Sequence, residues 1–211
     1  MSKTQIATGG IADDAVGNTK LDLTANYAFT GTITGAGAYN LLQTQTADNS
    51  STITFTSTYI TSTYNHYYVV CEGATFSVDG ADGTFEFSTN NGSSYSSNGS
   101  FYNQLAYDGT FRVDGPTTSQ SSMRTFSSVD GDNSNNNGIG CLEMHLFNLN
   151  ATADKKLVWF VAQNHTQNGD AGKYLIGHYG LDTTSAINNI RFGLNSSAAY
   201  VTGKFKLYGV S

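Results

Sequence analysis

From about residue 41 to the C-terminus, apolar and polar residues alternate in short runs. Residues 51–60 place Ile53, Phe55 and Tyr59 on one face of an extended chain and threonines on the other. The final run, residues 200–208, repeats the pattern with lysines and a threonine on its polar face. A period of two residues is typical of strands that bury one face.

Further runs of the same kind predict a protein built of β-strands. They cover residues 67–71, 75–78, 84–87, 141–149, 157–162, 174–179 and 187–194. The run at 157–161, Leu-Val-Trp-Phe-Val, is apolar on both faces, so we expect it to be the most buried strand. Residues 79–83 predict a hairpin turn between the strands on either side. About ten short strands without a helical pattern predict an all-β, jelly-roll-like β-sandwich.

Residues 1–40 differ from this β domain, which we place at 41–211. Their apolar side chains are sparse and about five residues apart, which fits neither helix nor strand. Such a segment needs a surface to lie on, or copies of itself, to bury these side chains. We therefore expect an extended N-terminal segment for docking or trimerisation, followed by a linker of small residues. The side chains expected to make these contacts are Ile6, Ile11, Val16, Leu21 and Leu23.

The charge pattern argues against nucleic acid as a partner. Only 12% of residues are charged, against about 25% in typical domains. The net charge is −6, and no Lys or Arg lies between Leu21 and Phe111, a stretch with several carboxylates. A phosphate backbone would be repelled by this half of the chain.

The sequence also predicts no membrane insertion, because no apolar run is long enough to cross a bilayer. The first residues, Met-Ser-Lys-Thr-Gln, lack the apolar core of a signal peptide, so we expect assembly in a cytoplasm. A reducing cytoplasm favours two buried thiols over a disulfide for Cys71 and Cys141.

No motif for catalysis, metal or cofactor binding is present. Patterns for hydrolases, nucleotide-binding loops, dinucleotide binding and zinc proteases are all missing. The loop at 130–138 begins D-x-D-x-S like a calcium loop, but Asn135 and Cys141 stand where a glycine and a glutamate are needed. His145, beside Glu143, is interpreted as a solvated histidine. We therefore predict no enzyme, no metal site and no cofactor.

Tyrosines are the more suggestive side chains. They cluster around His66 and again after an Asn/Ser-rich stretch, and aromatic rings beside amides and hydroxyls suit sugar rings. The alternative is that they pack sheet faces and subunit contacts with their hydroxyls reaching water. The candidate glycan-binding residues are Tyr64, Tyr67, Tyr68, Tyr95 and Tyr102.

Three stretches resemble bacteriophage virion proteins. Residues 10–21 contain Gly-Ile-Ala-Asp-Asp-Ala-Val followed by Thr-Lys-Leu, similar to one unit of the I-A-D-x-A-V…K-L repeats of tail-fibre shafts. Residues 190–210 end in Leu-Tyr-Gly-Val and resemble the closing strand pair of small phage fibre and decoration domains. Residues 85–95 resemble the mid-domain hairpin of the same group.

This resemblance implies a structural protein of a virion, assembled as a homotrimer on capsid, tail or adaptor proteins. The function that it implies is a short tail or head fibre whose β-sandwich head attaches to a host-surface glycan. Two alternatives stay open: a capsid decoration protein that cements the shell, and, more distantly, a carbohydrate-binding module. The presence of one shaft-like unit argues against a long fibre.

Overall fold

The computed structural model describes residues 38–107, 110–118, 123–126, 139–165, 172–195 and 197–211, with the backbone alone for 101–118. These residues form strands and no helix, and none of their segments is a helix able to span a membrane. The N-terminal contact residues and the loop at 130–138 lie outside this part. Their roles stay predictions.

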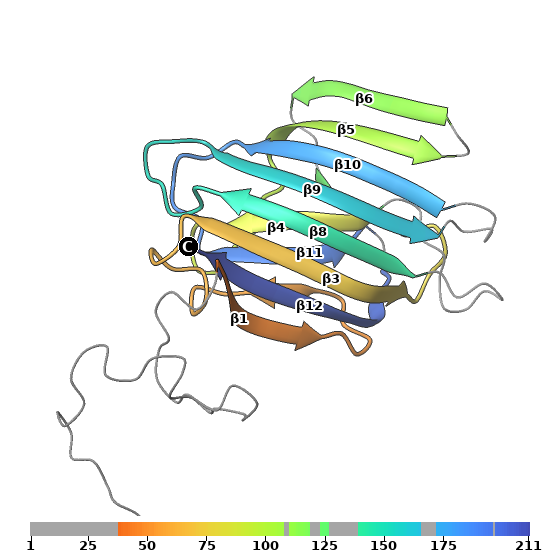
Figure 1. Ribbon diagram of the computed structural model, residues 1–211, viewed down its shortest axis with the longest axis horizontal. Coiled ribbons are helices and arrows are strands. Elements are labelled where there is room, and N and C mark those ends of the chain that lie inside the picture. The colour runs from red at the N-terminus through yellow and green to blue at the C-terminus, as the bar shows by residue number, and fades with distance from the viewer. Residues whose placement is uncertain (1–37, 108–109, 119–122, 127–138, 166–171, 196) are drawn as a thin grey trace, which may run out of the picture. The chain divides into compact units, whose positions relative to one another are not determined.

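Twelve strands make two antiparallel sheets, so the predicted all-β sandwich is confirmed (Figure 1). The larger sheet has eight strands in the order β1-β12-β3-β8-β9-β10-β5-β6, and the smaller has four, β2-β11-β4-β7. The strands are β1 Tyr39–Thr46, β2 Ile53–Phe55, β3 His66–Phe76, β4 Gly83–Ser88, β5 Gly99–Tyr107, β6 Thr110–Thr118, β7 Met123–Arg124, β8 Gly140–Phe147, β9 Lys156–His165, β10 Gly172–Leu181, β11 Asn189–Leu194 and β12 Tyr200–Val210.

The pairing of the strands is nested, as in a jelly roll. The chain alternates between the sheets, and early strands pair with late ones: β1 with β12, β2 with β11, β3 with β8 and β4 with β7. Two hairpins, β5–β6 and β9–β10, are inserted into this pattern, and both extend the larger sheet. The large sheet therefore offers a broad outer face, which lies toward the viewer in Figure 1.

The core lies between the two sheets. Inward side chains are large and aromatic, including Phe85 and Phe192 of the smaller sheet and Phe160 and Phe205 of the larger. Lys156, although fully buried, donates from Nζ to two backbone carbonyl oxygens, those of Ala151 at 2.7 Å and Asp154 at 2.9 Å. Such pairing is what makes burial of an ammonium group tolerable.

Two local predictions are wrong in an informative way. Residues 79–83 do not close a hairpin, because β3 belongs to the larger sheet and β4 to the smaller. The stretch resembling a closing strand pair is likewise split, with β11 in the smaller sheet and β12 in the larger. Turn residues indicate where a strand ends but not which sheet the next strand joins.

The third correction leads to the site. The strand at 157–161 is not buried on both faces. Val158 and Phe160 point into the core, whereas Leu157 and Trp159 are 55% and 42% exposed on the outer face of the larger sheet. Its outward apolar residues belong to a surface.

Candidate functional site

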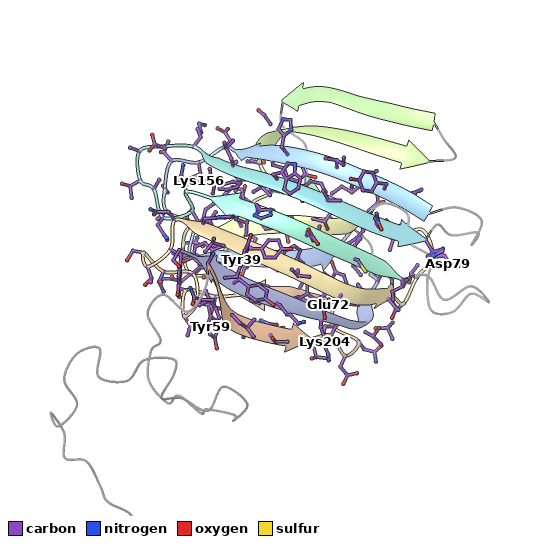
Figure 2. All side chains as sticks on the ribbon, in the orientation of Figure 1. Tyr39, Tyr59, Glu72, Asp79, Lys156 and Lys204 are labelled. Carbon is purple, nitrogen blue, oxygen red and sulfur yellow. The ribbon has the colours of Figure 1, made fainter. Side chains whose placement is uncertain are left out.

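Apolar and aromatic side chains gather on the outer face of the larger sheet. Four of the six large apolar residues that are exposed in the described part of the chain lie there, namely Tyr39, Leu41, Leu157 and Trp159. Figure 2 shows Tyr39 on this near side of the sheet, with Glu72 and Lys204 nearer its other end. A contiguous exposed apolar patch on a globular protein marks a contact surface.

The register of the strands aligns these residues in two adjacent rows across β1, β12, β3, β8 and β9. We call the ten residues of the two rows the aromatic face. One row is Leu41, Tyr208, Tyr68, His145 and Trp159, and the other is Tyr39, Val210, His66, Phe147 and Leu157. The first row continues on β10 at His178, and the register then reaches the position of Tyr102 on β5.

The rings of the aromatic face support one another. The ring of Tyr68 lies 5.3 Å from that of Tyr39 and 4.7 Å from that of His145, between centroids. The His145 ring lies 5.4 Å from the Trp159 ring, and Phe147 stacks on His66 at 4.5 Å. Side chains held in this way lose little conformational entropy when a partner covers them.

Two histidines meet in the middle of this surface. His66 Nε2 and His145 Nδ1 lie 2.9 Å apart, so one nitrogen donates and the other accepts. Burial lowers the pKa of both imidazoles, and the neighbouring His145 lowers the pKa of His66 further. His145 is half-buried and paired, so its interpretation as a solvated histidine is wrong.

The outer face of the smaller sheet has the opposite character. It carries a groove of about 500 Å³, which we call the polar groove, over β2, β11 and β4. Hydroxyl and amide side chains, one carboxylate and one guanidinium make up most of its wall. The lining residues are Ser51, Thr52, Thr84, Glu86, Ser97, Arg191, Gly193, Leu194 and Asn195.

Arg191 and Glu86 are paired at this groove. Both bonds end on one carboxylate oxygen, since Nε and Nη2 of Arg191 lie 2.8 Å and 2.7 Å from Glu86 Oε2. The guanidinium carbon also lies 4.0 Å from the centroid of the Tyr95 ring. The ring and the carboxylate fix the arginine in place.

The five candidate glycan-binding tyrosines do not form one site. Tyr68 lies on the aromatic face and Tyr95 beside the polar groove. Tyr67 is fully buried, so it belongs to the core and cannot contact a glycan. Tyr64 packs over Gly209, where an added Cβ would lie 2.4 Å from its ring. Tyr102 has the register position given above, and its side chain lies outside the described residues.

No group of three or more metal-ligating side chains occurs among the residues that the structure describes. Both cysteines are free, as the sequence predicts, but only Cys71 is buried; the prediction that Cys141 is buried too is wrong, since it is exposed on the outer face of β8. The sequence reasoning did not find Leu41, Leu157 and Trp159 as surface residues, nor the pair Glu86–Arg191. No pattern in the sequence carried either signal, because the run at 157–161 is apolar on both faces and the pair joins distant strands.

Comparisons of the chain with models of known protein families, with curated proteins and with solved structures found no match.

Proposed function

We propose that this chain is a structural protein of a bacteriophage virion that assembles with copies of itself through the aromatic face and displays the rest of its sandwich for attachment to a host surface. The resemblance of three stretches to phage fibre and decoration proteins supports the virion. The observation that carries the assembly role is the exposed aromatic face itself.

Exposure of the aromatic face to water is unfavourable in free energy. Full burial of a Leu, Phe or similar side chain is worth about 1.5–3 kcal/mol. Leu41 and Leu157 are each more than half exposed, so covering them contributes about 1 kcal/mol or more apiece. Trp and Tyr are the residues that dominate binding energy at protein interfaces, and both stand in these rows.

A second copy of this chain fits the face better than a sugar does. Sugars stack on an exposed ring face, whereas the rings of Phe147 and His66 stack on each other. The exposed leucines offer no hydrogen bond to a sugar. A mixed aliphatic and aromatic surface is typical of protein contacts.

Charge favours the same partner. Beside the aromatic face, Glu72 and Glu143 are balanced by Lys204 and Lys206. Copies therefore meet here without the repulsion that a net charge of −6 produces elsewhere.

The resemblance implies that the assembly is a homotrimer, and the shape of the aromatic face is compatible with a three-fold arrangement. Its two rows run across five strands as a narrow stripe about 19 Å long. Around a three-fold axis each copy meets two neighbours along such a stripe, and closed symmetry limits growth.

Analytical ultracentrifugation of the full chain tests this proposal. We expect a trimer for the wild type and a monomer with an unchanged β spectrum for Trp159→Ser. Val78→Ser is the matched control, since Val78 is 42% exposed but lies outside the aromatic face, and it should remain a trimer. A wild-type monomer, or a Trp159→Ser protein that stays trimeric, contradicts the proposal. A wild-type monomer would favour a decoration protein seated on a capsid.

A further inference from the structure

We propose that the polar groove on the smaller sheet binds a neutral carbohydrate, with Glu86 and Arg191 holding neighbouring hydroxyl groups of one sugar ring. This inference rests on the proposed attachment function and names its ligand class and site. It places the glycan contact beside Tyr95 on the smaller sheet, and not at Tyr68 on the aromatic face.

The groove exists because of how three strands meet. Gly193 of β11 lies opposite Thr84 of β4, and Arg191 lies opposite Glu86. A Cβ on Gly193 would lie 3.2 Å from Thr84 Oγ1 and 3.9 Å from Thr52 Cγ2. Any side chain at Gly193 would therefore fill the floor of the groove, and the glycine leaves room for a ligand.

The charges of the groove exclude ionic ligands. Its lining has one carboxylate and one guanidinium, already paired with each other. An anion would meet Glu86 and a cation would meet Arg191, so either would have to break the pair. A neutral ligand can use both groups and leave the pair intact.

The geometry of the pair leaves the right atoms available. Both contacts of Arg191 with Glu86 use Oε2, which leaves Glu86 Oε1 to accept and Arg191 Nη1 to donate. The two side chains are 26% and 30% exposed, so a ligand can reach them. One sugar hydroxyl can donate to Oε1 while its neighbour accepts from Nη1, and hydrogen bonds to charged groups are the stronger kind.

The rest of the wall matches the same ligand. Ser51, Thr52 and Thr84 offer hydroxyls that both donate and accept. Asn195 also lines the groove and is fixed by Asp82, which accepts from its Nδ2 at 2.9 Å. A few fixed polar groups that converge on a concave surface are what orient a small ligand.

The groove is suited to binding and not to hydrolysis. Glu86 is the one carboxylate among its lining residues, and glycoside hydrolysis uses a pair. The proposed interaction breaks no bond, which fits a protein that attaches to a surface and stays there.

Isothermal titration calorimetry with four neutral hexasaccharides, made of glucose in α- or β-linkage, mannose or N-acetylglucosamine, tests this inference. A hyaluronan hexasaccharide is the anionic comparison. We expect at least one neutral sugar to bind and the anionic one not to. Glu86→Gln should weaken that binding at least about ten-fold, because it removes the charged acceptor.

Two further variants separate loss of binding from loss of folding. Gly193→Ser fills the floor, and Thr52→Arg places a long side chain over the groove from an exposed position, so both should weaken binding by a similar factor. The matched control is Glu72→Gln, which breaks the Lys206 ion pair on the other sheet and should leave binding within about two-fold.

Absence of binding by all four neutral sugars would overturn the inference, and so would binding that survives Glu86→Gln and Thr52→Arg. If Trp159→Ala alone abolished binding, the sugar would lie on the aromatic face. A wild-type trimer that binds no sugar would contradict this inference but not the proposed assembly, so the experiments distinguish failure of one from failure of the other.

Discussion

Substitution of Tyr67 tests whether this side chain belongs to the core, as the structure shows, and not to the surface. Its ring is fully buried, and its hydroxyl donates to the Thr61 carbonyl oxygen at 2.6 Å and accepts from the Thr61 amide at 2.8 Å. Asn150 also donates to that carbonyl oxygen, so the carbonyl keeps a partner when the hydroxyl is removed. The amide loses the partner that it has in this structure.

We therefore expect Tyr67→Phe to lower the free energy of unfolding by about 1–3 kcal/mol, the cost of one lost hydrogen bond plus one unsatisfied group. Urea denaturation followed by circular dichroism measures the change. If the free energy of unfolding has the same slope against urea concentration in the variant and the wild type, the two proteins expose the same surface on unfolding. Tyr68→Phe is the control. Its side chain is half-buried on the outer face, where the loss of a hydroxyl leaves water to take its place, so we expect a change within about 0.5 kcal/mol. Equal stability of Tyr67→Phe and wild type would refute the reasoning.

Three other predictions concern the histidine pair, the two cysteines and the assembly of the chain. Burial lowers the folded-state pKa of His66 and His145, and the neighbouring His145 lowers that of His66 further, so the folded protein binds fewer protons than the unfolded chain. Stability is fully present above pH 6.5 and should fall as the pH drops below it, whereas the double variant His66→Gln/His145→Gln should flatten this dependence in urea titrations. Burial raises the pKa of the Cys71 thiol, so a maleimide should label Cys141 alone in the native protein and both thiols in urea; rapid native labelling of Cys71 would contradict the buried position. A protein that begins at Tyr39 should remain trimeric by light scattering if the aromatic face carries assembly, and monomeric if Ile6, Ile11, Val16, Leu21 and Leu23 carry it.

The fold class was predictable because it depends on local patterns. Alternation with a period of two and turn residues between runs identified most strands of both sheets. The pairing of early with late strands was not visible, since it depends on contacts between distant parts of the chain. The residues at 79–83 illustrate this, because the same turn signal serves a hairpin or a crossing between sheets.

For the candidate site, the sequence predicted the kinds of side chain involved, apolar residues and tyrosines, but not which of them lie on the surface. An apolar run such as Leu157–Phe160 reads as buried on both faces, because sequence does not reveal whether the second face meets core or a partner. The tyrosines likewise look alike in sequence, yet the core holds Tyr67 and the surface holds its neighbour Tyr68. The pair Glu86–Arg191 joins residues 105 positions apart, which no local pattern encodes.

The most direct test of the central claim uses Trp159, the only tryptophan of the chain. Because it lies on the aromatic face, its fluorescence reports whether that face is covered. We predict blue-shifted emission and weak acrylamide quenching at concentrations where the chain is assembled, with a red shift and stronger quenching on dilution. Emission typical of a solvent-exposed tryptophan in a protein that sediments as a trimer would contradict assembly through this face.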